Sequence, residues 1–249
     1  MGSLVPSSKV VYIGYDPRDF TGFRVAKYTF RVWDKHVPIL GLVLDDLRHQ
    51  GLYYRPTEVR VNSEGRKQLW DVISDAPMST EFSISRFLVP HLAKTGWALF
   101  VDGDVMALGN VSRVFDLADP NKAVMCVQHA HDPLDGVKMD GQLQTRYSRK
   151  NWSSVMLFNC DHPANKQLTV EMVNTFPGRD LHRFCWLEDD EIGELPQEYN
   201  YLVGYTHLNS GRTPVIVHFT SGLPDMAGYE NQEYADKWRD FLPYAAGAM

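Results

Sequence analysis

The chain has 249 residues, a formal net charge of −6, and a content of 44% hydrophobic and 22% charged residues. This composition is ordinary for a globular protein, and a chain of this length buries a sizeable core without disulfides or structural metal ions. Because there is no basic region, a nucleic-acid partner is disfavoured without being excluded, and no run of about 18 apolar residues predicts a membrane span.

The three cysteines, Cys126, Cys160 and Cys185, are spread through the chain without a close pair. They form neither a CxxC motif nor a disulfide framework, so we expect reduced thiols in a cytoplasmic protein. Residues 1–9 are polar and lack the apolar stretch of a signal peptide, which predicts a flexible N-terminus. No linker interrupts the sequence, so a single domain over residues 1–249 is expected.

The first part of the chain alternates between strand and helix patterns. Residues 10–14 form a short apolar, β-branched run, and residues 20–34 carry aromatic side chains at helical spacing. Two further strands are predicted at 37–44 and 57–61. This β-α-β order indicates a parallel or mixed sheet covered by helices.

A second helix is predicted over residues 79–94, with Ser79 or Thr80 as its N-cap. Pro90 must end, kink or restart that helix, because proline has no backbone N–H group to donate. The continuous apolar run at residues 97–101 that follows is typical of a central strand buried on both faces.

The second half of the chain changes character. Strands are predicted at 123–127, 155–158 and 214–218, and a helix at 165–176. Between the first two strands lies a long polar excursion, residues 129–151. Loops of that length within a domain are usually functional or mobile.

Asp102 and Asp104 stand directly after the most hydrophobic predicted strand, with Gly103 between them. Residues two apart in an extended segment project to the same side, so the two carboxylates are expected to converge. Ligands of open α/β sheets bind at the carboxyl ends of strands, and a hard divalent cation would neutralise the two charges. A D-x-D sequence taken alone also occurs in solvated turns.

His218 stands at the end of the last predicted strand. A histidine there is a reasonable third ligand beside two carboxylates, because Mn²⁺ accepts mixed oxygen and nitrogen ligands. The alternative is a histidine packed in the core or hydrogen-bonded in a loop.

Several short segments occur in an informative order between residues 10 and 224. They are Tyr12 to Asp16, Ser85 to Leu88, Leu99 to Val105, Asn110 to Phe115, Asp189 to Tyr201, and Val217 to Gly222. In this order they resemble the motifs of the family-8 retaining glycosyltransferases, the family that includes glycogenin and bacterial galactosyltransferases.

The resemblance implies a fold and an activity. The fold is an α/β, Rossmann-like GT-A domain, with a mixed, mostly parallel central sheet flanked by helices. The activity is transfer of a hexose from a UDP-sugar, with glucose or galactose as the expected sugar, to an acceptor hydroxyl with retention of configuration. The implied cofactor is Mn²⁺ or Mg²⁺, and the acceptor is not identified.

The resemblance also implies roles for individual residues. Asp102, Asp104 and His218 would hold the metal, and Asp189 and Arg86 would be catalytic, with Asp189 near the anomeric carbon of the donor. The residues implied in donor binding are Tyr12, Gly14, Asp16, Arg86, Asp102, Gly103 and Gly222. Each assignment has a plainer alternative: Tyr12 as a core aromatic, Arg86 as a surface helix residue, and Asp189 as part of a solvated charge run.

The chain departs from the family pattern at several positions. Asp190 stands where the family has glutamine, and the lysine that normally binds phosphate after the terminal motif is missing. The residues considered as substitutes for that lysine are Lys237, Arg212, Arg146 and Arg149.

Two other functions are therefore kept open. A sugar nucleotidyltransferase would share the sheet and the metal but normally begins with a glycine-rich loop, which the first thirty residues lack. A non-catalytic protein that binds nucleotide sugars or carbohydrate would be consistent with the missing lysine.

Overall fold

The structure is a computed structural model that describes residues 8–61, 65–129 and 151–247. Most of the predicted N-terminal tail and of the polar excursion at 129–151 therefore lies outside the described residues. Arg146 and Arg149 lie outside them as well.

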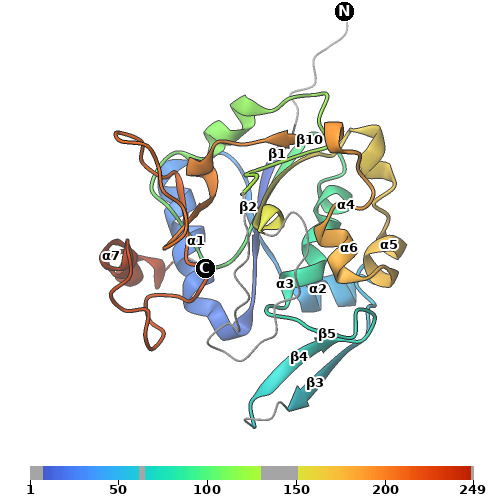
Figure 1. The fold of residues 1–249 in the computed structure, drawn as a ribbon, viewed down its shortest axis with the longest axis horizontal. Helices are drawn as coiled ribbons and strands as arrows, with labels where there is room; N and C mark the ends of the chain where they lie inside the picture. Colours follow the sequence, from blue (N-terminus) through green and yellow to red (C-terminus); the bar gives the residue numbers. More distant parts are fainter. Residues whose placement is uncertain (1–7, 62–64, 130–150, 248–249) are drawn as a thin grey trace, which may run out of the picture.

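A six-stranded sheet with strand order β10-β8-β9-β6-β1-β2 runs through the middle of the molecule (Figure 1). All of these strands run parallel except β9, which is antiparallel to both of its neighbours. The predicted mixed, mostly parallel α/β sheet is thus confirmed. The strands are β1 (Lys9–Gly14), β2 (Ile39–Leu42), β6 (Trp97–Val101), β8 (Val124–Cys126), β9 (Val155–Asn159) and β10 (Ile192–Glu194).

Helices cover both faces of this sheet (Figure 1). On one side lie α1 (Phe20–Trp33) and α7 (Ala235–Ala245). On the other lie α2 (Leu44–His49), α3 (Phe82–Ser85), α4 (Val89–Ala93), α5 (Val170–Thr175) and α6 (Gly178–His182). Among the described residues, no helix combines the length and apolar character needed to cross a bilayer.

The side chains of β6 pack into two separate hydrophobic clusters, because they alternate between the two faces of the sheet. Phe100 packs with Phe82 and Phe87 on the side of α3, whereas Leu99 and Val101 belong to the cluster that contains residues of α1. Burying a side chain as large as that of Phe100 stabilises the fold by about 1.5–3 kcal/mol. The apolar run of β6 therefore fixes the strand in the middle of the sheet.

The two longer helices predicted in the middle of the chain are shorter or broken in the structure. The segment 79–94 divides into α3, the 3₁₀ helix η2 (Arg86–Leu88) and α4. Pro90 falls in the first turn of α4, where no backbone N–H is required. The helix predicted from residue 165 starts only at α5, after the Thr169 side chain caps the backbone N–H of Met172.

Two small sheets flank the central one. One has the order β11-β12-β7 and the other β3-β4-β5, which projects from the body as a hairpin (Figure 1). Their strands are β3 (Thr57–Val61), β4 (Lys67–Asp71), β5 (Ala76–Pro77), β7 (Val105–Ala107), β11 (Tyr201–Leu202) and β12 (Ile216–His218). The first of these sheets lies beside the carboxyl end of β6. Its strand β7 starts there, and its strand β12 ends there.

Candidate active site

The turn after β6 is shaped by a close approach of two strands. Tyr12 and Ile13 of β1 pair with Phe100 and Val101, so the end of β1 lies beside Gly103. A Cβ atom at position 103 would lie 2.5 Å from the carbonyl oxygen of Gly14, closer than real Cβ atoms come. Only glycine fits there, and this lets the chain turn sharply between Asp102 and Asp104.

His218 reaches the same place from another sheet. It ends β12, which pairs antiparallel with β7 so that His218 lies opposite Val105. The backbone N–H of Phe219 donates to the carbonyl oxygen of Asp104 at 3.0 Å. This register brings the imidazole beside the carboxylates, although more than a hundred residues separate the two segments.

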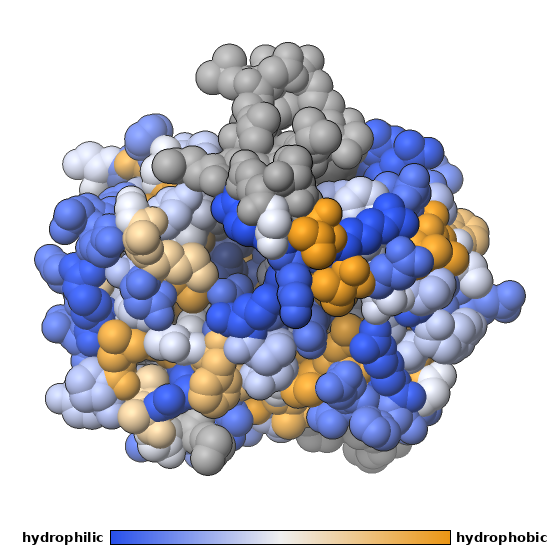
Figure 2. All heavy atoms as spheres, turned by 90° about the horizontal axis from the view of Figure 1, so that it is seen from below, coloured by the Kyte–Doolittle hydropathy of each residue, from blue (hydrophilic) through white to orange (hydrophobic). Residues whose placement is uncertain are grey.

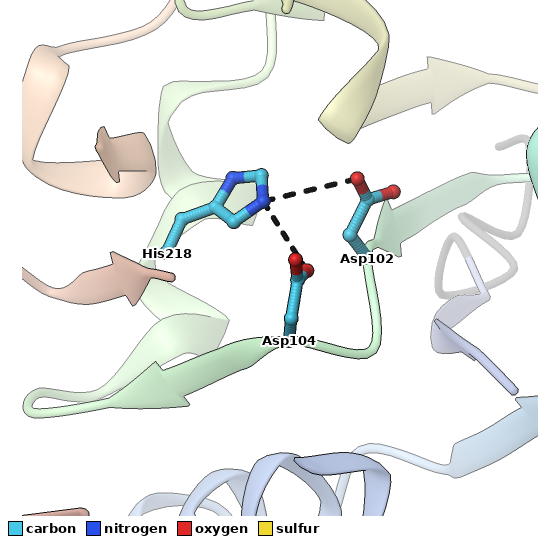
Figure 3. Close-up of side chains that lie close together, drawn as sticks. All are labelled: Asp102, Asp104 and His218. Atoms are coloured by element: carbon cyan, nitrogen blue, oxygen red, sulfur yellow. Dashed lines mark ion pairs between the residues drawn. The ribbon is translucent and has the colours of Figure 1, made fainter. Parts of the chain in front are cut away.

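The three predicted metal ligands converge (Figure 3). Nε2 of His218 lies 3.2 Å from Oδ1 of Asp104 and 3.9 Å from Oδ2 of Asp102. One ligand atom from each residue lies within 4.8 Å of the others, and in the described ranges this is the one such cluster of histidine, cysteine and acidic residues.

The chemistry of these donors fits a divalent cation. Two carboxylates held together repel each other unless a positive charge compensates. Carboxylate oxygens suit Mg²⁺ and Mn²⁺, and an imidazole nitrogen is acceptable to Mn²⁺. Such ions take six ligands, so three protein ligands leave positions open for a substrate.

Negative charge extends beyond the cluster. Burial of its carboxyl group raises the pKa of Asp19 to about 6, and the charges of Asp16 and Asp104 add to that effect. The carboxyl ends of β1 and β6 thus form a region where a cation would be stabilised.

Arg86 lies next to the cluster and is buried rather than on the surface of a helix. Its Nη1 atom is 2.7 Å from Oδ1 of Asp102 and donates to the carbonyl oxygen of Ser153 at 2.8 Å. Its guanidinium also lies over the ring of Phe100, 4.9 Å from the centroid. Arg86 therefore holds one oxygen of Asp102 while the other faces His218.

Tyr12 and Asp16, two of the residues implied in donor binding, are both buried. Tyr12 is 8% exposed and belongs to the core cluster that contains Phe82 and Phe100. Asp16 is 1% exposed, and its carboxylate accepts four hydrogen bonds, from the backbone N–H, Nε and Nη2 of Arg18 and from the backbone N–H of Glu81.

These contacts decide the charge state of Asp16. Burial alone would raise the pKa of its carboxyl group, but the hydrogen bonds from Arg18 and from the backbone outweigh burial and lower the pKa. Asp16 is therefore a charged, saturated anchor for the loop that follows β1.

Gly14 and Gly222 both lie against aromatic rings. A Cβ atom on Gly14 would lie 2.6 Å from the ring of Phe82, and one on Gly222 would lie 2.6 Å from the ring of Tyr229. The carbonyl oxygen of Gly222 accepts a hydrogen bond from Nε2 of Gln232 at 2.7 Å. Both glycines thus allow close packing at the edge of the site.

The structure does not bring Asp189 to this cluster. Asp189 is exposed and begins the 3₁₀ helix η6 (Asp189–Glu191), which leads into the amino end of β10. Because β10, β8 and β6 run in the same direction, Asp189 lies at the edge of the sheet opposite to Asp102. A place for Asp189 near the anomeric carbon of a bound donor stays a prediction.

Of the four candidate substitutes for the phosphate-binding lysine, the two that lie within the described residues are not part of the cluster. Arg212 forms an ion pair with Glu198. Lys237 is exposed on α7, a helix on the outer side of α1.

Sequence reasoning missed the residues that support the cluster from behind. Asn200 is fully buried, and its amide contacts His218 and Ser154. Asn200 lies in the segment Asp189 to Tyr201 that resembles a family motif, but nothing in the local sequence indicates that this asparagine faces the last strand. A buried asparagine just before a strand indicates a support for the site only once the strand pairing is known.

Figure 2 shows the molecule from below the view of Figure 1. On this face, hydrophilic side chains predominate and the hydrophobic ones among the described residues form small separate groups. Such a surface suits a polar ligand better than an extended apolar partner.

Comparison of the fold with solved structures identifies its class. The glycosyltransferase GlyE of Streptococcus pneumoniae is 13% identical, with a TM-score of 0.58 over 95% of this chain and 60% of that chain. The galactosyltransferase LgtC, solved with donor and acceptor sugar analogues, is 10% identical, with a TM-score of 0.56 over 94% of this chain and 95% of that chain. The bifunctional glycosyltransferase WbbM has a TM-score of 0.59 at 13% identity, and the chain spans 52% of its length. The chain thus has the GT-A glycosyltransferase fold.

The sequence comparison is more specific. Protein CDI of Arabidopsis thaliana is 42% identical over 233 residues, which cover 92% of this chain and 83% of that protein. The chain belongs to the same family as Protein CDI. No family model matches it.

Proposed function

We propose that the chain is a retaining glycosyltransferase of the family-8 type, which transfers a hexose from a UDP-sugar to an acceptor hydroxyl. The observation that carries the proposal is the convergence of Asp102, Asp104 and His218 at the carboxyl edge of a GT-A sheet. This arrangement matches the ligand set that the order of sequence motifs implies. The donor sugar is expected to be glucose or galactose.

In this proposal Asp102, Asp104 and His218 hold Mn²⁺ or Mg²⁺. When bound, the metal would act as a Lewis acid toward the departing diphosphate. Arg86 keeps the Asp102 carboxylate in place through Oδ1, so the proposed role of Arg86 is to position a ligand rather than to touch the sugar. Gly103 keeps the turn narrow enough for both carboxylates to face one point.

The cysteines agree with the cytoplasmic location that we propose. Cys126, Cys160 and Cys185 are all free thiols. Burial raises the pKa of Cys160 to about 12, with the charge of Asp161 adding to the effect, so this thiol stays protonated and unreactive at neutral pH.

One alternative has an observation in its favour. Asp189, the carboxylate that the resemblance places near the donor sugar, lies at the edge of the sheet opposite to the cluster. A protein that binds nucleotide sugars without turning them over is therefore the second candidate function.

Release of UDP tests both candidates. The protein is incubated with UDP-glucose or UDP-galactose and Mn²⁺, and free UDP and the anomeric form of the newly released sugar are followed by NMR. We expect UDP release that stops with EDTA and returns with Mn²⁺, and a sugar that appears first as the α anomer. Donor binding without UDP release would favour the non-catalytic alternative, and release of pyrophosphate from a nucleoside triphosphate and a sugar phosphate would favour a nucleotidyltransferase.

Matched aspartate variants locate the activity. Asp102→Asn and Asp104→Asn each remove a ligand charge and are expected to abolish metal-dependent UDP release. Asp190→Asn removes an exposed charge at the opposite edge and serves as the control. Full activity of Asp102→Asn and Asp104→Asn would refute the assignment.

A further inference from the structure

Asn200 is the hub of a buried hydrogen-bond network behind the candidate metal site. It is 0% exposed and ends the 3₁₀ helix η7 (Gln197–Asn200). Its amide oxygen lies 3.0 Å from Nδ1 of His218, and its amide nitrogen lies 2.9 Å from Oγ of Ser154 and 3.0 Å from Nε2 of His129. All parts of this side-chain amide are therefore in contact with polar partners.

The direction of the hydrogen bonds follows from a carbonyl group at one end. Oγ of Ser154 lies 2.8 Å from the backbone carbonyl oxygen of Asn151, which can only accept. The Ser154 hydroxyl thus donates its hydrogen to that carbonyl oxygen, and its Oγ must accept a hydrogen bond from Asn200. The group of Asn200 that faces Ser154 is consequently the NH₂ donor, which leaves the amide oxygen to face His218.

This direction fixes the proton on the imidazole of His218. An amide oxygen can only accept, so Nδ1 of His218 must carry the hydrogen that it receives. In the neutral ring the lone pair then belongs to Nε2, the nitrogen that lies 3.2 Å from Oδ1 of Asp104. That is the tautomer a metal ligand requires at this point.

Ser154 ties the two ligand segments together. Its backbone carbonyl oxygen accepts from the backbone N–H of Asp102 at 3.0 Å, while its side chain accepts from Asn200. Asp102, which follows β6, and His218, which ends β12, are thus linked through Asn200 and through Ser154, the residue just before β9. A shift of either ligand would break hydrogen bonds to buried groups, which have no water to replace them.

We propose that Asn200 is a positioning residue that sets the tautomer and ring orientation of His218 for metal binding, with Ser154 as its support. This proposal rests on the proposed metal site. Residues that orient a ligating histidine in this way typically contribute 10–100-fold to metal affinity or activity.

The first test needs no variant. The ring nitrogens of His218 are observed by ¹⁵N NMR in metal-free protein and in protein loaded with Mg²⁺, which is diamagnetic. A hydrogen on Nδ1 in both forms is expected, and an unprotonated Nδ1 would overturn the proposal.

The second test measures the affinity for Mn²⁺ alone by calorimetry. Asn200→Leu removes the acceptor at similar volume and should weaken Mn²⁺ binding about 10–100-fold. Asn200→Asp keeps an acceptor for Nδ1 and should bind Mn²⁺ more tightly than Asn200→Leu. Ser154→Ala tests the support through a smaller change, should Asn200→Leu fail to fold, and should also weaken binding.

The matched control is Asn165→Leu. Asn165 is also buried and hydrogen-bonded, to the backbone oxygens of Ala123 and Asn159, but it lies at the opposite edge of the sheet. This variant should lose stability and keep the wild-type affinity for Mn²⁺.

The outcomes separate the two proposals. If the wild-type protein binds Mn²⁺ and Asp104→Asn does not, while Asn200→Leu and Ser154→Ala bind as tightly as wild type, the positioning role is wrong and the metal site stands. If the wild-type protein binds no Mn²⁺, the proposed metal site fails and the positioning role fails with it.

Discussion

Two buried arginine–aspartate pairs, Arg55–Asp71 and Arg86–Asp102, differ in how completely they are closed. Nε and Nη2 of Arg55 each lie 2.6 Å from a different oxygen of Asp71, and the two side chains are 0% and 2% exposed. Nη1 of Arg86 lies 2.7 Å from Oδ1 of Asp102, and these side chains are 6% and 15% exposed. The same two residue types therefore build a sealed pair in one region and an open one in the other.

The surroundings of the pairs explain the difference. Nη1 of Arg55 also donates to the backbone oxygens of Val173 and Phe176, so the guanidinium fastens the end of α5 to the hairpin that contains β4. Asp71 accepts in addition from the backbone N–H of Ser74. Within the described part of the chain, Asp71 belongs to no group of possible metal ligands, whereas Oδ2 of Asp102 lies 3.9 Å from Nε2 of His218. Both oxygens of Asp71 accept hydrogen bonds within the protein, so the Arg55–Asp71 pair stabilises the fold. Oδ2 of Asp102 faces His218, so the Arg86–Asp102 pair can take part in binding.

The largest expected effect is on stability. Arg55→Leu leaves the Asp71 carboxylate buried without its partner, and the loss should be about 3–5 kcal/mol in the free energy of unfolding, measured by urea denaturation. UDP release by the fraction that stays folded should match wild type.

The double variant Arg55→Leu/Asp71→Leu checks the reason for that loss. Removing both charges takes away the uncompensated carboxylate, so this variant should be more stable than Arg55→Leu alone. A double variant that is less stable than the single one would show that the packing of Arg55, not its charge, carries the effect.

Arg86→Leu should lower activity more than stability, the reverse of Arg55→Leu. We expect UDP release to fall about 10–100-fold, because Asp102 loses the contact that positions it as a ligand. The free energy of unfolding should fall less than in Arg55→Leu, since Asp102 keeps some exposure and can be compensated by a bound cation. Unfolding in urea with and without Mn²⁺, beside kinetics of UDP release, measures both quantities. A variant that loses stability and keeps its activity would make this pair equivalent to Arg55–Asp71.

The sequence predicted the part of the site that depends on local patterns. The apolar run 97–101 became β6, and the alternation of an extended chain was enough to predict that Asp102 and Asp104 converge after it. His218 was found in the same way, as the last residue of a short strand. The strands at 10–14 and 57–61 were also confirmed, because β-branched residues dominate both.

The features of the site that the sequence did not predict depend on contacts between distant segments. Whether Asp189 reaches the site depends on the edge of the sheet at which β10 begins, and the three residues of β10 give no recognisable strand pattern. The role of Asn200 depends on the meeting of three segments at its amide. The saturation of Asp16 by Arg18 is local, but the sequence did not show that the loop closes on itself.

The smallest expected effect concerns the pH dependence of stability beside the open pair. Nδ1 of His182 lies 2.7 Å from Oγ of Ser153, whose carbonyl oxygen accepts from Arg86. Burial of the ring lowers the pKa of His182 to about 3, and the positive charge of Arg86 contributes. The sealed pair, Arg55–Asp71, has no histidine in hydrogen-bond contact among the described residues.

A histidine with a lowered pKa makes the folded protein less stable as the pH falls. Below pH 6.5 the unfolded chain binds a proton at His182 and the folded protein does not, so the stability is complete above pH 6.5 and declines toward pH 3. Between pH 7 and 5.5 the free energy of unfolding should fall by about 1 kcal/mol through His182.

His182→Gln should remove that part of the pH dependence, measured by urea unfolding at both pH values. The result is taken as the difference from wild type, because Asp19 with its raised pKa contributes a slope of the opposite sign. Arg86→Leu should make the slope shallower, because the pKa of His182 rises when the positive charge of Arg86 is removed. Parallel slopes for wild type and His182→Gln would mean that the ring takes up its proton in the folded state as readily as in the unfolded chain.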